Sequence, residues 1–250
     1  MPRPDRGPGE GARGPCHRTR ADRRGPGGAP AAHRGAGAAR AEPVSRPRQG
    51  LRLHGFEPYS AANGPGTRAV VWVQGCTLGC PGCFNPESHG RGGDETDVDE
   101  LFDRVRGLGD AVEGVTISGG EPLQQCEPVL RLLGRIRAET SLSAVLFTGY
   151  RWAEVARMPK AAGLRDRVDV LLAGRYEPQQ RIARGLRGSA NKTVHLFSDR
   201  YTLDDLVAVP DAEVVIHPDG RLTLTGIDPL AFTSGATGPQ HQSVDIEVRE

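Results

Sequence analysis

The sequence has no apolar run as long as a membrane-spanning helix, which needs about 20 predominantly apolar residues. Its amino-terminal stretch also lacks the short apolar segment at the centre of a secretory signal. These two absences predict a protein with no membrane partner. They place it by expectation in the cytoplasm, where thiols stay reduced.

The first 50 residues lack Leu, Ile, Phe, Tyr and Trp, and contain one Val. They hold ten Gly, eight Pro and eleven Arg. Such a segment cannot bury enough apolar surface to offset the entropy of ordering it, so we expect a disordered extension over residues 1–50. An arginine-rich arm that binds RNA or anionic lipid is the alternative. A third reading is an upstream extension translated from GC-rich sequence, with the working protein starting near Leu51.

The chain also lacks a strong net charge, because its formal charge is +1. Eleven Arg against four acids give residues 1–50 a charge of +7, which leaves −6 for the other 200 residues. A mildly acidic main part gives no indication of a nucleic-acid surface, so no nucleic-acid partner is predicted for it. We expect one functional domain over residues 51–230 and a flexible tail over residues 231–250.

From residue 51 onward, short β-branched runs alternate with helical patterns. This alternation predicts an α/β fold with parallel strands joined by crossover helices. Five strands are too few for a complete eight-stranded barrel, so the expected architecture is a partial (β/α) barrel with a carboxyl-terminal β-hairpin. The predicted strands span residues 68–74, 114–118, 144–148, 168–173 and 193–197, the helices 98–106, 128–139 and 152–158, and the hairpin 213–217 with 222–225.

Cysteine is scarce and unevenly placed: three of the five lie within eight residues. An odd total with this clustering argues against a disulfide framework and for a metal site. Cys76, Cys80 and Cys83 have the spacing C-x3-C-x2-C, which can hold three corners of a [4Fe–4S] cube. Cys16 and Cys126 are remote, so one iron would be left open for a ligand.

A zinc site is the competing interpretation of this cluster, with His89 as the fourth ligand. Closed zinc sites usually pair their ligands as two short motifs. One block of three cysteines with a single distant histidine fits that arrangement poorly, and the iron–sulfur interpretation is favoured.

Several further residues accompany the cysteines. They are Asn63-Gly64-Pro65-Gly66-Thr67-Arg68, Gln74-Gly75 before Cys76, and Pro81-Gly82-Cys83-Phe84-Asn85. Together the motifs resemble the radical S-adenosylmethionine superfamily, and within it the activases of glycyl-radical enzymes, the branch for anaerobic ribonucleotide reductase in particular. The resemblance spans about residues 51–198. Gly82, which the resemblance includes among the cofactor-binding residues, stands where most of the wider superfamily has an aromatic residue, as in that branch.

The turn Gly119-Gly120-Glu121-Pro122 directly follows the second predicted strand. Adjacent glycines let a ligand approach the backbone closely. The resemblance implies that these four residues bind the amino group of S-adenosylmethionine, and a simple strand-to-helix turn is the alternative. Phe84 is a candidate for packing against the adenine, with ordinary core packing as its alternative.

The resemblance implies the reaction as well. A reduced [4Fe–4S] cluster cleaves S-adenosylmethionine to methionine and a 5′-deoxyadenosyl radical, which abstracts a hydrogen from a target. No side chain is then needed as a catalytic acid or base. Implied partners are reduced flavodoxin or ferredoxin as electron donor and a glycyl-radical enzyme as target.

Two other functions remain open from the sequence. One is a radical enzyme that modifies a peptide or small metabolite. The other is a non-catalytic iron–sulfur or zinc protein. Ala173 bears on the choice, because the activases usually carry an acid there.

Loops at the carboxyl ends of parallel strands meet at one rim of a sheet. We therefore expect Cys76, Gly119 and the segments 148–150, 174–175 and 198–199 to converge.

Overall fold

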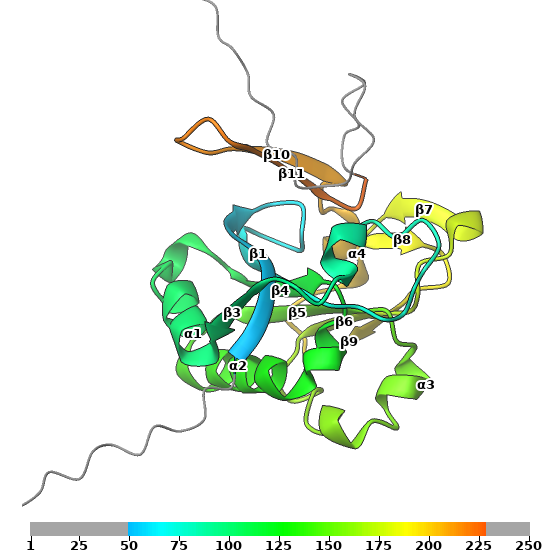
Figure 1. Ribbon diagram of the computed structural model, residues 1–250, viewed down its shortest axis with the longest axis horizontal. Coiled ribbons are helices and arrows are strands. Elements are labelled where there is room, and N and C mark those ends of the chain that lie inside the picture. The colour runs from blue at the N-terminus through cyan, green and yellow to red at the C-terminus, as the bar shows by residue number, and fades with distance from the viewer. Residues whose placement is uncertain (1–49, 229–250) are drawn as a thin grey trace, which may run out of the picture. The chain divides into compact units, whose positions relative to one another are not determined.

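The computed structural model describes residues 50–228, and its centre is a seven-stranded mixed sheet (Figure 1). The strand order is β3-β1-β2-β4-β5-β6-β9. No helix in the described range is long and apolar enough to cross a membrane. The strands are β1 (Gly50–Ser60), β2 (Arg68–Val73), β3 (Asp94–Asp97), β4 (Gly114–Gly119), β5 (Ser143–Thr148), β6 (Val170–Ala173) and β9 (Thr193–Leu196).

Strands β2, β4, β5 and β6 run parallel, as the alternation of strands and helices predicts. Helices α1 (Val98–Arg106) and α2 (Cys126–Glu139) connect them on one face of the sheet (Figure 1). Both helices turn an apolar stripe towards alternate residues of the strands. The resulting main core includes Val71, Ile117, Leu146 and Leu171 of the sheet, Leu101, Phe102 and Val105 of α1, and Leu132, Leu133 and Ile136 of α2.

The start of α1 shows why the helix forms where the sequence predicts it. Asp97 precedes the helix, and its carboxylate accepts a hydrogen bond from Asp99 N at 2.7 Å. This cap satisfies one of the amide groups that a helix leaves free at its first turn. The predicted span of 98–106 is confirmed, and α2 begins two residues before its predicted start.

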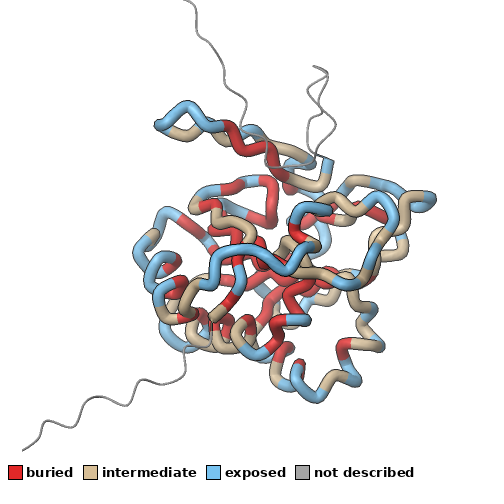
Figure 2. Tube along the Cα trace, viewed as in Figure 1, coloured by how far each residue is buried: buried red, intermediate tan, exposed pale blue. Residues whose placement is uncertain are grey.

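The other face of the sheet carries a smaller core and the entrance to a pocket. Its apolar residues include Val145, Val170 and Leu172, which pack against Leu186 and against Leu206 of helix α4 (Leu203–Val207). Figure 2 shows the buried segments concentrated in the central strands. The remaining elements are helix α3 (Trp152–Val155), the antiparallel pair β7 (Arg181–Arg184) and β8 (Arg187–Ser189), and the antiparallel pair β10 (Ala212–Ile216) and β11 (Leu222–Gly226).

The sheet differs from the prediction at both edges. Strands β1 and β3 were not predicted, and both pair antiparallel, β1 with β2 and β3 with β1. Strand β9 lies at the predicted position but runs antiparallel to β6. The expectation of uniformly parallel strands is therefore wrong at these edges.

The reversal of β9 also corrects the expected rim. Ser198 Oγ donates a hydrogen bond to Asp169 Oδ1 at 2.6 Å, and Asp169 immediately precedes β6. Segment 198–199 thus lies at the amino end of the parallel strands, away from the other four loops. The residues just before β9 take its place at the carboxyl rim.

The predictions for the amino-terminal extension and the tail after residue 230 lie outside the described residues. The predicted limits of the functional domain stay a prediction.

Candidate functional site

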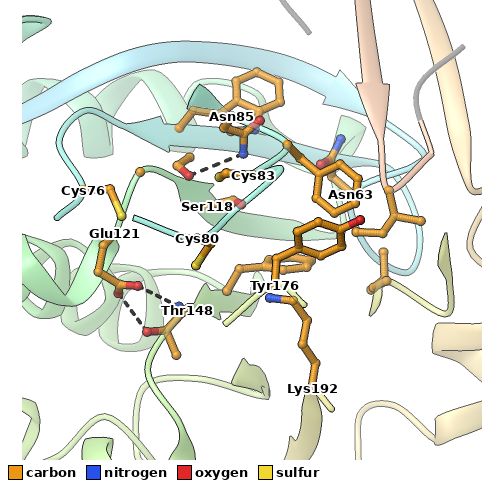
Figure 3. A pocket seen from close by; sticks show the side chains of 18 of the residues that line it. Asn63, Cys76, Cys80, Cys83, Asn85, Ser118, Glu121, Thr148, Tyr176 and Lys192 are labelled. Carbon is orange, nitrogen blue, oxygen red and sulfur yellow. Dashed lines mark hydrogen bonds between the residues drawn. The ribbon is translucent and has the colours of Figure 1, made fainter. Parts of the chain in front are cut away.

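The three clustered cysteines follow β2 directly and line one pocket at the carboxyl end of the parallel strands (Figure 3). Each is partly exposed, and each is a free thiol. The turn after β4 lines the same pocket. Cys126, by contrast, is buried at the start of α2, where its Sγ contacts Lys160 O at 3.0 Å. The structure therefore separates the cluster from the fourth described cysteine, as the spacing predicts.

Backbone hydrogen bonds join the cysteine loop to the turn after β4. Glu121 N donates to Gly75 O at 2.9 Å, and Gly120 N donates to Val73 O at 2.8 Å. A Cβ on Gly120 would lie 2.5 Å from Gly75 O, closer than atoms can approach. Gly119 has a φ of +98°, a conformation that L side chains rarely adopt. The two glycines are thus required for the close contact between the two loops.

The start of the cysteine loop is also held by residues that follow the three cysteines. Gly75 N donates to Ser88 O at 2.7 Å, and Cys76 N donates to His89 O at 3.2 Å. Ser88 and His89 belong to a short 3-10 turn, η1 (Pro86–His89). Backbone hydrogen bonds to the turn after β4 and to η1 therefore hold the cysteine loop in place, and none of them uses a cysteine sulfur atom.

Glu121 is fully buried, and its carboxylate accepts three hydrogen bonds. Oε1 accepts from Leu123 N at 2.9 Å and Thr148 Oγ1 at 2.8 Å, while Oε2 accepts from Gly149 N at 2.7 Å (Figure 3). A carboxylate has about four acceptor positions, so one on Oε2 remains. Burial raises the pKa of Glu121, and the three hydrogen bonds oppose that rise. Pro122 opens the next 3-10 turn, η3 (Pro122–Gln125), and fixes the direction in which the chain leaves the site.

The donor set suits an iron–sulfur cluster. Burial raises the pKa of the Cys76 and Cys83 thiols, and a metal that binds them would favour their thiolate form. Within residues 50–228, no three His, Cys, Asp or Glu side chains gather closely enough to hold a single ion. A cluster is larger than an ion, and its three thiolates each bind a different iron.

The other predicted site residues lie around the same loop. Phe84 lines the pocket and packs against Tyr176, with ring centroids 4.5 Å apart. Gly82 has a φ of +63°, and a Cβ there would lie 3.6 Å from Tyr176 Cε1. Gly82 therefore serves the turn between Cys80 and Cys83.

Several pocket residues were not among the predicted cofactor contacts, including Asn63, Ser118, Tyr176 and Lys192 (Figure 3). Lys192 was missed because the predicted direction of β9 put it at the wrong end of the sheet. The rarity of lysine in this chain could have singled out Lys192, since the sequence has two lysines against thirty arginines.

The departure at Ala173 also has a structural setting. Ala173 ends β6 with its side chain buried in the main core. Arg175 follows it, and its Nη1 lies 2.7 Å from Glu154 Oε2 in an ion pair. Position 173 therefore contributes no acid to the pocket, and the nearby Arg175 is neutralised by Glu154 of α3.

A family model described as "4Fe-4S single cluster domain" matches residues 62–195, which include all three clustered cysteines and the turn after β4. The chain belongs to this family. Among curated proteins, it is 31% identical over 159 residues to the anaerobic ribonucleoside-triphosphate reductase-activating protein of Vibrio cholerae, covering 59% of this chain and 99% of that one. The protein of the same name from Salmonella typhimurium is 33% identical over 155 residues, covering 58% and 98%. These relatives confirm the resemblance stated from the motifs.

Among solved structures, a crystal structure of QueE from Escherichia coli is similar with a TM-score of 0.33 and 18% identity. The match covers 41% of this chain and 55% of that one.

Proposed function

We propose that this protein is a radical S-adenosylmethionine enzyme that activates a glycyl-radical enzyme, with anaerobic ribonucleotide reductase as the first target. One observation carries the proposal: Cys76, Cys80 and Cys83 line the same pocket as the Gly119-Gly120-Glu121 turn. Three thiolates beside a turn suited to an ammonium group match a cluster that binds its second cofactor at an open iron. The relatives named as reductase-activating proteins support the choice of target.

In this proposal the three cysteines bind three irons of a [4Fe–4S] cluster. When bound, the two cofactors supply a one-electron cleavage of a carbon–sulfur bond and a 5′-deoxyadenosyl radical. The protein's own residues bind, orient and exclude water. Because the radical chemistry belongs to the cofactors, no side chain is assigned as a catalytic acid or base.

The turn after β4 holds the amino group of S-adenosylmethionine. The carbonyl groups of Gly119 and Gly120 and the remaining acceptor position of Glu121 are its partners. Pro122 and Gly82 shape the two loops that border this position. Phe84, steadied by Tyr176 at 4.5 Å, offers an aromatic face to the adenine.

We interpret the sheet as part of a barrel, and we place the target glycine beyond the cofactor on the face of the sheet that lines the pocket. Trp72, Ser118 and Phe147 line the pocket from β2, β4 and β5. Reduced flavodoxin or ferredoxin is the proposed electron donor.

An anaerobic assay tests the proposal. The cluster-loaded full chain, reduced with dithionite or flavodoxin, is expected to convert S-adenosylmethionine to 5′-deoxyadenosine, measured by chromatography. Adding anaerobic ribonucleotide reductase should speed this conversion and produce a glycyl radical, detected by electron paramagnetic resonance. Cys76→Ala is the control and should form neither product.

The two halves of the proposal fail separately. Deoxyadenosine without a glycyl radical would reject the activase function and keep the cofactor chemistry. No deoxyadenosine from a loaded, reduced cluster would reject both.

A further inference from the structure

Lys192 lies at the carboxyl rim of the parallel strands because β9 runs backwards. It immediately precedes β9, and the next residue, Thr193, pairs with Ala173 at the end of β6. Lys192 lines the pocket together with Cys80 and Glu121, and Figure 3 shows its side chain reaching into the space that they border. The ammonium group therefore belongs to the site of the cysteines.

The hydrogen bonding of this ammonium group is incomplete. Within residues 50–228, Lys192 Nζ makes one hydrogen bond, to Gly174 O at 2.7 Å, and no ion pair. An ammonium group has three donors, and a carbonyl oxygen carries no full charge. Two donors and one positive charge thus face the pocket without an anionic partner from the described residues.

Two arginines close to this pocket are already neutralised. Arg175 forms its ion pair with Glu154, and Arg181, which lies over the Phe84 ring, forms one with Asp228. Lys192 differs from both because no carboxylate pairs with it. Its charge is available to something that enters the pocket.

The environment makes an anion favourable at this position. Burial lowers the pKa of Lys192, and the attraction of Cys80, Glu121 and Cys83 opposes the shift. A half-buried cation that has lost part of its hydration is stabilised by a direct anionic partner. The nearby Glu121 has used three of its acceptor positions on other donors and leaves one for a cation of the ligand.

We infer that Lys192 binds the carboxylate of an α-amino-acid group in the ligand, opposite the Gly119-Gly120-Glu121 turn that binds its ammonium group. One pocket then presents a cation and an anion to the two charges of one zwitterion. Under the proposed function, on which this inference rests, the zwitterion is the methionine end of S-adenosylmethionine. Lys192 is a cofactor-binding residue that lies directly before β9, the strand whose direction reverses.

The composition of the chain agrees with a specific role. Thirty of the 32 basic residues are arginines, and Lys160, the other lysine, is exposed. An ammonium group is compact and can approach one carboxylate oxygen within a confined space, whereas a guanidinium is larger and planar.

Two ligands separate the amino-acid group from the rest of the cofactor. S-adenosylmethionine carries that group, whereas 5′-methylthioadenosine keeps the nucleoside and the sulfur, as a neutral thioether, and lacks the amino-acid group. Their affinities for the anaerobic, cluster-loaded full chain are measured by calorimetry. Lys192→Met is expected to weaken S-adenosylmethionine on the order of tenfold to a hundredfold and to leave 5′-methylthioadenosine unchanged. Lys192→Arg should restore part of the loss, and Lys160→Met, the matched control, should change neither affinity.

Other outcomes overturn the inference. Equal weakening of both ligands would make Lys192 a structural residue of the pocket. Lys192→Met could instead keep the preference for S-adenosylmethionine over 5′-methylthioadenosine and shift the midpoint potential of the cluster. That result would show that the charge of Lys192 acts on the cluster and not on the ligand. If Lys192→Met does not load iron, Lys192→Gln, which keeps a donor for Gly174 O, takes its place.

The proposed function fails by a different result. A wild-type protein that loads iron but binds S-adenosylmethionine no better than 5′-methylthioadenosine would contradict the cofactor assignment itself. A wild-type preference that Lys192→Met retains would contradict only the role of Lys192.

Discussion

Arg68 and Lys192 are basic residues at opposite ends of the same parallel strands, and they differ in how far the protein satisfies them. Arg68 is completely buried at the start of β2, with six hydrogen bonds. Lys192 has one. The acceptors of Arg68 are Pro65 O, Val115 O, Thr116 Oγ1, Ser143 O, Ser143 Oγ and Tyr201 OH.

The difference shows how to distinguish a structural charge from one kept for a ligand. A guanidinium surrounded by acceptors ties β2, β4 and β5 together at the amino end of the strands, and removing it takes a hydrogen-bond donor from each of those acceptors. A cation with free donors adds little to folding. We therefore expect the amino end of the strands to provide stability and the carboxyl end to provide binding. Substitutions at the two ends test this division.

The largest effect is expected at the carboxyl end, from removing one ligand of the cluster. Cys76→Ala should abolish a stable cluster of about four irons per chain, because two thiolates cannot hold the cube. Cys126→Ala is the matched control and should keep its iron. Iron analysis and the visible absorption after anaerobic reconstitution measure both. Loss of iron in Cys126→Ala, with Cys76→Ala still loaded, would contradict the assignment.

Arg68→Met tests the amino end. It should lower the free energy of unfolding by about 3 to 5 kcal/mol, because buried acceptors lose their donors. Arg106→Met, which breaks an exposed ion pair with Asp103, should change it by less than about 1 kcal/mol. Urea unfolding measures both. If Arg68→Met destabilises no more than the control does, the amino end is not the stabilising region.

Gly120→Ala tests the contact that holds the two site loops together. The added Cβ would overlap Gly75 O, so the loops must separate at a cost of about 1 to 3 kcal/mol. Cluster loading should fall with it. In Gly79→Ala the Cβ meets no atom within 4 Å, and only the positive φ opposes it, at about 1 kcal/mol. Iron content and unfolding of the two variants are compared, and equal iron loss would show that contact with Gly75 is not the cause.

The smallest effect is expected from the ion pair at the rim. The hydrogen bonds from Arg175 and from the Arg151 backbone lower the pKa of Glu154 to about 2. Because its pKa is depressed in the folded state, the pair adds stability above about pH 4.5, which is lost as the pH falls towards 2. The pair is solvent-exposed, so the amount is a few tenths of a kcal/mol.

Glu154→Gln should remove that part of the acid dependence, while Glu100→Gln, at an exposed position on α1, should not. Urea unfolding between pH 3 and pH 7 measures the difference. A slope as steep in Glu154→Gln as in the wild-type protein would count against the pair.

Sequence patterns located the helices and the central strands because these have strong periodicity. The apolar stripe of α1 and its cap at Asp97 predict residues 98–106, and the structure agrees. Spacing likewise predicted that the cysteines lie together. Strand β1 was missed because its sequence, GLRLHGFEPYS, mixes buried and exposed positions without regular alternation.

Strand direction is the property that periodicity does not carry. A parallel return needs a crossover, usually a helix, and the segment between β6 and β9 has no α-helix, only the 3-10 turn η5 (Pro178–Gln180) and a short hairpin, β7 with β8. The missing helical pattern between residues 174 and 192 was the available sign that β9 runs backwards. Attending to it would have placed Lys192 at the site and removed Ser198 from it.

The reversed strand also limits how large this fold can grow. Each right-handed strand–helix–strand unit starts and ends at fixed ends of the sheet, so units can be added one after another like turns of a spiral. Strand β9 ends at the opposite side, where a further unit of the same kind cannot begin. The two edge strands, β3 and β9, do not pair with each other within the described residues, so the sheet stays open and does not close into a barrel.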